Sequence, residues 1–256
     1  MDRVLMVSRA LVLDIFARGK APDGLAHPKR SLIKRVSGTI AKQDFYVSGK
    51  RDVESLKKFL KQNAINYDDF KTVMDFGCGV ARMARHFKTN SNSVIGVDYA
   101  EDMVDWCNNN LHEVGQFICN QHGDFSHIPD NSVDFIHSRS VFTHMHEGDF
   151  LTWLEQLARV VNAEGYVYLT INGEQRVNEE IPVILTKQEK KSFHNGELVV
   201  VNPNVSSDNR AINEHQCYGY VNREGFTALS RPWFEVVAFQ PGKKAYQQDI
   251  YLLKKV

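Results

Sequence analysis

The fold is decided by residues 72–87, which read TVMDFGCGVARMARHF. The first five residues, Thr72 to Phe76, are typical of a short buried strand. Glycines at positions 77 and 79 then allow a tight turn and let a ligand come close to the backbone. The residues that follow, as far as Phe87, are expected to form a helix. A strand that leads through a glycine turn into a helix is typical of an open α/β sheet.

The rest of the chain continues this alternation of strand and helix. Further strands are expected at 93–98, 116–121, 133–138 and 165–171, and helices at 101–113, 147–162 and 222–231. Such alternation predicts right-handed crossovers and a parallel sheet with helices on both faces. Gly165 is expected to stop the helix before it. The segments 234–239 and 249–253 flank a short turn, which predicts an antiparallel hairpin that completes the sheet.

The N-terminal fifty residues are expected to form an extension of the main domain. Residues 20–50 contain several glycines and prolines and are expected to form a loop, before a helix that begins after Asp52. Residues 4–16 are apolar, but Arg9 and Asp14 interrupt them and no cleavage site follows, which argues against a signal peptide. We expect an amphipathic helix there, packed on the body of the protein or on a second subunit of a homodimer.

Composition excludes several classes of protein. The chain has 256 residues, and its 31 Lys+Arg balance 31 Asp+Glu, so no basic surface for nucleic-acid phosphates is expected. Its four cysteines contain no C-x-x-C pair, which indicates neither a disulfide framework nor a structural zinc site. No segment is apolar enough to predict a membrane span. A cytoplasmic location follows as the simplest expectation.

About fifty residues, 172–221, separate the fifth strand from the next helix. Connections of this length are uncommon and are usually functional. We expect a partly ordered cap, inserted in a main domain of residues 51–256, with polar and aromatic side chains that recognise an acceptor molecule. The residues concerned are Asn172, Glu174, His215, Tyr218 and Tyr220. The alternative is a decorative insertion or a subunit contact.

Three carboxylates follow three successive strands of the predicted sheet. Asp75 precedes the glycine turn, Asp98 ends the second strand, and Asp124 follows the third. Ligands of open parallel sheets bind at the carboxyl ends of the strands. A carboxylate beside the turn would repel a pyrophosphate and suits a positively charged ligand. Asp98 suits the hydroxyls of a ribose and Asp124 the amine of adenine. These features together predict S-adenosylmethionine. Each acid taken alone is equally compatible with a helix cap or a solvated strand end.

The chain resembles the class I S-adenosylmethionine-dependent methyltransferases. The stretches that carry the resemblance are VMDFGCGVARMARHF (73–87), VIGVDYAEDMVDWC (94–107), GDFSHIPDNSVDFIHSRSVFTHM (123–145) and LEQLARVVNAEGYVYLTING (154–173). The resemblance covers residues 50–256. It implies a Rossmann-like sheet of seven strands, mostly parallel, with the last strand reversed.

The resemblance also implies which residues bind the cofactor. Gly77, Cys78 and Gly79 would flank its methionine part together with Asp75. Asp98 would bind the ribose. The remaining implied contacts are Tyr99 and Met103 on the adenosine side, Asp124 with Phe125 at the adenine edge, and Ser138 toward the methyl group. Ala81 stands where a third glycine is common, and its methyl group could crowd the cofactor.

A narrower likeness connects the chain with a bacterial subgroup associated with sugar or polysaccharide assembly. It rests on VSGTIAKQDFYVSGKRD (36–52), SVFTHM (140–145) and YQQDIYLLKK (246–255). Tyr46 and Arg51, within the first stretch, would fold over the cofactor, where Arg51 could pair with its carboxylate. The alternative is that both belong to a solvated linker.

His144 is the candidate general base for the acceptor, because imidazole suits proton removal from a hydroxyl or amine. A hydrogen bond that only tethers its loop is an equally good interpretation. His144 and His146 point different ways and lack a third ligand, so no metal site is expected. The residues after the fourth strand, from Ser138 to Val141, lack the Asn/Asp-Pro-Pro-aromatic stretch of DNA amino-methyltransferases.

The expected function is transfer of a methyl group to a small polar acceptor, a sugar or related metabolite, on oxygen rather than nitrogen. The main alternative is an inactive S-adenosylmethionine-binding or scaffold protein of the same fold, for which Ala81 is the only sign. A hydride-transferring oxidoreductase ranks third, because Arg82 occupies the last glycine position of the dinucleotide fingerprint.

Overall fold

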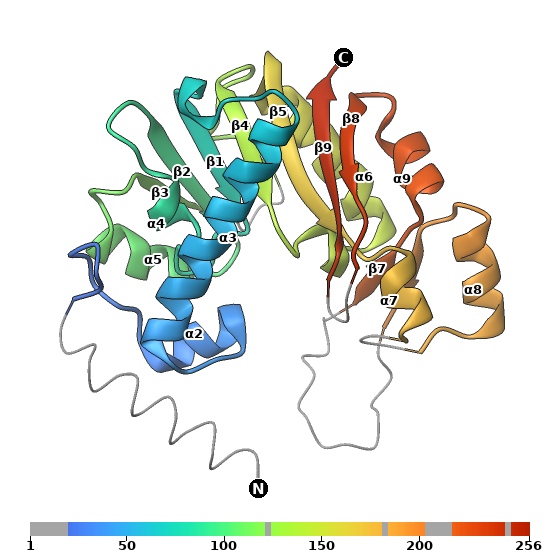
Figure 1. Cartoon of the computed structure of the whole chain (residues 1–256), viewed down its shortest axis with the longest axis horizontal. Coiled ribbons are helices and arrows are strands. Elements are labelled where there is room, and N and C mark those ends of the chain that lie inside the picture. Colours follow the sequence, from blue (N-terminus) through green and yellow to red (C-terminus); the bar gives the residue numbers. More distant parts are fainter. Residues whose placement is uncertain (1–19, 121–123, 181–183, 203–216, 244–246) are drawn as a thin grey trace, which may run out of the picture. The chain divides into compact units, whose positions relative to one another are not determined.

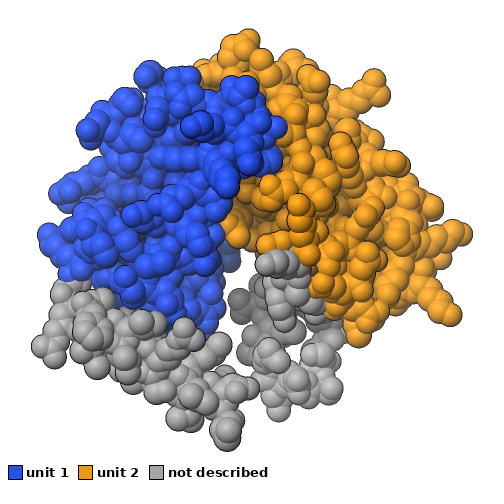
Figure 2. Space-filling model, viewed as in Figure 1, with its two compact units in different colours: residues 1–123 blue, residues 124–256 orange. Residues whose placement is uncertain are grey.

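The computed structural model describes residues 20–120, 124–180, 184–202, 217–243 and 247–256. It divides into two compact units, unit 1 comprising residues 1–123 and unit 2 residues 124–256 (Figure 2). The helix expected at 4–16 and the candidate residue His215 lie outside the described residues. Within those residues, no helix is both long and apolar enough to cross a membrane.

Unit 1 contains three parallel strands in the order β3-β2-β1 (Figure 1). Their bounds are Thr72–Phe76 for β1, Ser93–Asp98 for β2 and Gln116–Cys119 for β3. The register places Asp75 beside Gly96 and Phe76 beside Val97. Helix α5 (Glu101–Asn110) follows β2 as expected, whereas α4 (Ala84–Phe87) is only four residues long because residues 79–83 form turns. The strand expectations for this unit are confirmed.

The expected loop at 20–50 is wrong, because two helices occupy much of it. Helix α2 spans Arg30–Ser37 and ends at Gly38, whose φ of 70° gives a left-handed cap. Helix α3 spans Lys42–Gln62 and therefore crosses the expected domain boundary at residue 50. Its buried side chains continue at helical spacing on both sides of that boundary, from Phe45 and Tyr46 to Val53 and Leu56. The single glycines and the cap signal at Asp52 suggested a helix start after residue 52, although the buried side chains of α3 form one continuous apolar face.

Unit 2 contains four strands in the order β4-β5-β9-β8. β4 (Val133–Ser138) and β5 (Val161–Ile171) are parallel, and β9 (Asp249–Lys255) is antiparallel to both β5 and β8 (Phe234–Gln240). Helix α6 (Glu147–Val160) precedes β5, and α9 (Arg223–Ser230) precedes β8. The C-terminal hairpin is confirmed, and the seven strands of the two units give the expected mixed α/β sheet.

The boundary between α6 and β5 differs from the expectation that Gly165 stops the helix. The helix ends at Val160, and Val161 already has extended backbone angles and pairs with Val133 of β4. Gly165 lies inside β5. Burial of the β-branched Val161 in the sheet ends the helix two residues before its expected end at residue 162.

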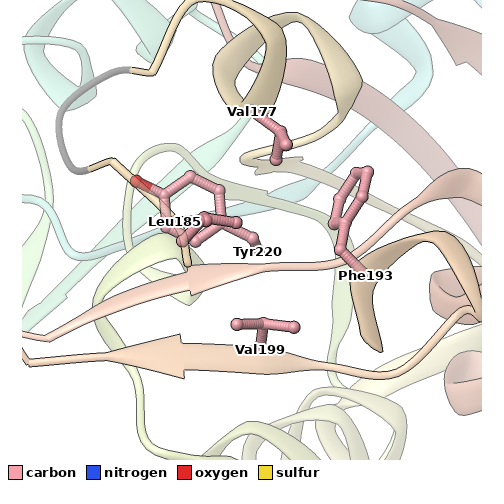
Figure 3. Close-up of a cluster of buried hydrophobic side chains, with 5 residues drawn as sticks. All are labelled: Val177, Leu185, Phe193, Val199 and Tyr220. Atoms are coloured by element: carbon pink, nitrogen blue, oxygen red, sulfur yellow. The ribbon is translucent and has the colours of Figure 1, made fainter. Parts of the chain in front are cut away.

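The cap, residues 172–221, contains α7 (Glu174–Asn178), α8 (Lys187–His194) and a two-stranded antiparallel sheet of β6 (Val199–Val201) and β7 (Tyr218–Tyr220). Its own small core is a cluster of buried side chains drawn in Figure 3, namely Val177, Leu185, Phe193, Val199 and Tyr220. Asn172 joins this core to β5, since its side-chain amide donates to the Gly219 carbonyl at 3.0 Å. The described residues of the cap therefore form an ordered element that follows the carboxyl end of β5.

A buried ion pair fixes the chain segment before α2. The guanidinium of Arg85 in α4 is fully buried and donates two hydrogen bonds to Asp23, at 2.8 and 2.9 Å. Burial alone would raise the pKa of Asp23, but the hydrogen bonds and charge of Arg85 outweigh it and lower this pKa. Asp23 therefore stabilises the fold above its normal pKa, and this contribution is lost as the pH falls through the lowered value.

We expect Asp23→Ala to reduce the free energy of unfolding by about 3–5 kcal/mol, because the Arg85 guanidinium would stay buried without its partner. Asp102→Ala is the matched control. It breaks the pair between Arg35 and Asp102, whose side chains are both about half exposed, and should cost less than about 1 kcal/mol. Urea denaturation of both variants measures the difference, and equal losses would contradict the assignment.

Candidate functional site

The glycine turn after β1 is held by the end of β2. The backbone N–H groups of Gly77 and Cys78 both donate to the carbonyl of Val97, at 2.8 and 3.0 Å. The N–H of Gly79 donates to Oδ2 of Asp98 at 2.7 Å, and that of Ala100 donates to Oδ1 at 3.0 Å. The carboxylate of Asp98 thus connects the glycine turn with the start of α5. The glycine turn predicted from the sequence is present in unit 1.

Two carboxylates are nearly buried beside this turn. Asp75 and Asp98 are 3% and 8% exposed. Burial raises the pKa of Asp98, the hydrogen bonds from Ala100 and Gly79 lower it, and the negative charge of Asp75 raises it, with a net increase. Two like charges in a poorly solvated site favour a ligand that brings positive charge. Asp98 also retains acceptor capacity for ribose hydroxyls, because each carboxylate oxygen has two lone pairs. The residues fit S-adenosylmethionine.

Ala81 keeps the backbone conformation of the glycine that it replaces. Its φ is 57°, close to the 53° of Gly79, and its side chain is fully buried. A Cβ atom on Gly79 would lie 2.6 Å from Cγ2 of Val36 in α2, so that position has no room for a side chain. The turn therefore retains its shape with alanine as its third member, at the energetic cost of a left-handed non-glycine residue.

The other residues expected at the cofactor in unit 1 have different surroundings. Tyr99, directly after Asp98, is 76% exposed and open to a ligand. Met103 is buried in α5. The Cys78 thiol is buried too, and burial raises its pKa well above the usual value. Its sulfur and that of Cys107 both lie 3.6 Å from the Gly79 carbonyl oxygen, so these thiols support the turn.

Tyr46 and Arg51 do not come together, and neither lies in a linker, because both belong to α3. The Tyr46 ring packs edge-on against His86, with 4.8 Å between ring centroids. Burial and the charge of Arg85 lower the pKa of His86 to about 4. Arg51 is largely exposed and lies 3.8 Å from Asp52. Tyr46 thus serves the packing of α3, and a contact of Arg51 with the cofactor stays a prediction.

The two residues expected at the adenine edge have different environments, because one is an exposed carboxylate and the other a buried ring. Asp124 is exposed, and its Oδ1 accepts from the N–H of Ser126 at 3.0 Å. The Phe125 ring is buried and packs against Trp153, with 4.9 Å between centroids. The side chain of Phe125 therefore belongs to the core of unit 2. Contact of Asp124 with adenine stays a prediction.

Ser138 ends β4 with a buried hydroxyl. Its side chain is fully buried, and its Oγ has no hydrogen-bond partner among the described residues. An unpaired buried hydroxyl costs free energy, so such groups often mark functional sites or bound water. This observation agrees with the expectation that Ser138 faces a ligand.

His144 lies in a short helix η2 (Phe142–His144), a few residues after β4. Its Nδ1 lies 3.0 Å from the carbonyl oxygen of Cys217, the residue before β7. A carbonyl only accepts, so Nδ1 carries the proton and Nε2 is left as the basic nitrogen. Desolvation by the surrounding protein atoms lowers the pKa of His144, and the positive charge of Arg176 lowers it further. The hydrogen bond to the Cys217 carbonyl raises this pKa, and the net change is a decrease. The imidazole is therefore neutral at neutral pH.

Sequence reasoning missed a group of polar side chains beside His144. The Thr170 hydroxyl at the end of β5 accepts from the Ser140 N–H at 2.9 Å and donates to Oε1 of Gln248 at 2.7 Å. The Ser140 hydroxyl donates to the same Oε1 at 2.9 Å, and the Gln248 amide reaches Thr143 at 3.4 Å. Only the fold unites these residues, because they come from three distant segments. No group of three metal-binding side chains occurs in the described part of the chain.

Affinity for S-adenosylmethionine should fall as the pH is lowered through the raised pKa of Asp98, because the cationic ligand favours the ionised carboxylate. Asp98→Asn should weaken binding by about 2–4 kcal/mol, on the order of 30-fold to 1000-fold, through loss of charge-assisted hydrogen bonds. The variant should also lose this pH dependence. Calorimetric titration tests both, with the exposed Asp105→Asn as control. An unchanged dissociation constant in a folded Asp98→Asn protein would place the ribose elsewhere.

Comparisons with known proteins agree with this geometry. Residues 74–169 match the model of a family described as a methyltransferase domain. The chain is similar in structure to an S-adenosylmethionine-dependent methyltransferase from Methanosarcina mazei, with a TM-score of 0.55 and 14% identity over 72% of this chain and 92% of that one.

Two further similar structures contain bound S-adenosylhomocysteine. The 1,6-didemethyltoxoflavin-N1-methyltransferase of Burkholderia thailandensis, with S-adenosylhomocysteine, has a TM-score of 0.52 and 18% identity over 92% of both chains. The magnesium protoporphyrin IX methyltransferase of Synechocystis, also with S-adenosylhomocysteine, has a TM-score of 0.54 and 14% identity over 84% and 87%. These findings show that residues 74–169 match a methyltransferase domain, and the similar structures share the α/β fold of this chain.

Proposed function

We propose that this protein transfers the methyl group of S-adenosylmethionine to a hydroxyl of a small polar acceptor, such as a sugar, with His144 as general base. The observation that carries the proposal is the hydrogen bond between Nδ1 of His144 and the Cys217 carbonyl. It orients the imidazole and leaves Nε2 with a lone pair. The two interpretations of His144, tether and base, are thereby compatible.

The reaction is an in-line displacement at the methyl carbon. The bond between this carbon and the acceptor oxygen forms as its bond to sulfur breaks, and S-adenosylhomocysteine leaves. The hydroxyl proton passes to Nε2 of His144. Because the sulfonium is already a good leaving group, the protein contributes chiefly by aligning the reactants and excluding water. A base adds a factor of about 10²–10⁴ for a hydroxyl acceptor.

The polar group beside His144 supports a hydroxylated acceptor. Ser140, Thr143, Thr170 and Gln248 supply both donors and acceptors at the carboxyl ends of β4 and β5. The similar enzymes of Burkholderia and Synechocystis are named for small-molecule substrates, which agrees with a small acceptor here. The neighbouring cap, with Tyr218 packed near the His144 ring at 5.1 Å, suits recognition of that acceptor.

The backbone of Ala81 favours an active enzyme over the alternative of an inactive scaffold. Ala81 was its sign, and Ala81 adopts the left-handed backbone of a glycine within an intact turn. An S-adenosylmethionine-binding protein without turnover would still need Asp98, but it would have no use for an oriented base. Activity therefore distinguishes the two functions.

Two substitutions of His144 separate base from tether. In His144→Asn the amide nitrogen can replace Nδ1 as donor to Cys217, but the side chain has no basic nitrogen; His144→Ala loses both. Screening nucleotide sugars and small polyols with the wild type identifies an acceptor. We expect His144→Asn to lower kcat about 10²–10⁴-fold on it with little loss of thermal stability.

The exposed His146→Asn, two residues away, is the matched control and should turn over normally. In the wild type, kcat/KM should fall only as the pH drops through the lowered pKa of His144, below the usual range of histidine. Wild-type turnover by His144→Asn would mean that His144 only tethers its loop.

Removing the cap outright would be a poor test of acceptor recognition. A replacement of residues 174–210 would delete four of the five members of the cluster in Figure 3 and expose Tyr220. Single substitutions at the inner edge of the cap preserve this core and so give a cleaner result.

A further inference from the structure

The first residue of β9 carries a nearly buried carboxylate at the same edge of the sheet. Asp249 pairs with Ile171, the last residue of β5, and is only 4% exposed. Its Oδ1 accepts from the Gly242 N–H at 2.8 Å. Its Oδ2 lies against Gly173, where a Cβ atom would be 1.9 Å away, so only glycine leaves room for the carboxylate. Oδ2 has no hydrogen-bond partner among the described residues.

A second polar group on the same face of β9 is also unsatisfied. Side chains two residues apart on a strand share a face, so Tyr251 lies beside Asp249. Tyr251 is fully buried between Phe226 and Phe239, with ring centroids 4.3 and 4.9 Å away. Its hydroxyl has no hydrogen-bond partner within the described residues. Burial raises the pKa of this phenol, and the charge of Asp249 raises it further.

Charged residues of opposite sign act on these two groups. Glu174, in the first turn of α7, repels Asp249, and burial together with this repulsion raises the pKa of Asp249. Arg223 in α9 acts on Tyr251 with the opposite sign, and its guanidinium lies over the Phe239 ring at 4.6 Å.

Neither group contributes a complete internal interaction to the fold. A phenol without a partner costs free energy when buried, and so does a nearly buried carboxylate that accepts from a described residue through only one oxygen. Residues that cost stability in this way are characteristic of functional sites. Together they supply one charged acceptor and one hydroxyl, which suits a cationic group with several N–H donors.

We propose that Asp249 and Tyr251 bind the protonated amino group of the methyl acceptor, which is therefore an amino sugar or a related amino polyol. The proposal rests on the function proposed above and assigns its substrate class. Asp249 accepts hydrogen bonds from the ammonium through Oδ2, and the Tyr251 oxygen accepts another. A hydroxyl of the same molecule is the methylated group.

Glucosamine and glucose are suitable probes, because they differ only in the amino group. We expect calorimetry in the presence of S-adenosylhomocysteine, at neutral pH, to show at least about tenfold tighter binding of glucosamine, equivalent to about 1.4 kcal/mol. Asp249→Asn keeps the acceptor for Gly242 but loses the charge, and should remove this preference. The exposed Glu155→Gln in α6 is the control and should retain it.

Thermal unfolding gives an independent readout. Asp249→Asn and Tyr251→Phe should both raise the Tm, because each removes an uncompensated buried group, whereas Glu155→Gln should not change it. A lowered Tm in both variants would show that these side chains are structural and overturn the proposal. Equal binding of the two sugars by a protein that binds S-adenosylhomocysteine would overturn it as well. Failure to bind S-adenosylhomocysteine would instead contradict the function proposed above.

Discussion

The glycine turn of unit 1 depends on the hydrogen bonds that the carboxylate of Asp98 accepts. This carboxylate ends β2, accepts from the N–H of Gly79 and, through its other oxygen, from that of Ala100. One side chain therefore fixes both the glycine turn and the start of α5. The same carboxylate is nearly buried, and burial raises its pKa. A nearly buried carboxylate favours a ligand with hydroxyl donors and positive charge, so the residue that shapes the turn also suits the cofactor expected there.

Local signals in the sequence predicted the strands of both units well. The glycine after β1 and the acid that ends β2 marked those strands, and short apolar runs indicated β4 and the C-terminal hairpin. The N-terminal helices were missed, because prolines and glycines such as Pro28 and Gly38 suggest a loop. In fact Gly38 only ends α2, and Gly49 lets α3 approach the backbone of Arg82, where a Cβ atom would lie 2.0 Å from its carbonyl oxygen. That second role depends on a neighbour thirty-three residues away, which no local pattern reveals.

The candidate site shows the same division between local and distant information. Asp75, Asp98 and the glycines were found because their spacing follows the strands. The sequence named His144 but left base and tether as alternatives, since its partner is a backbone carbonyl at Cys217. Every residue has a backbone carbonyl, so the sequence does not show which one accepts from His144. The polar group around Thr170 and Gln248 was missed for a related reason, because hydroxyls and amides are common on surfaces and gain meaning only when strands bring them together.

Buried polar side chains among the described residues differ in how completely their hydrogen-bonding groups are paired. In the N-terminal segment the buried guanidinium of Arg85 is paired bidentately with Asp23, as stability requires. In unit 2, by contrast, the register aligns Ser138 with Leu169, and Leu169 with Tyr251, so two unpartnered buried hydroxyls lie in one row across three strands. Asp249, two residues before Tyr251, adds a half-paired carboxylate. Their shared position at the carboxyl ends of β4 and β5 is where an open α/β sheet binds ligands, which supports the acceptor that we propose as their partner.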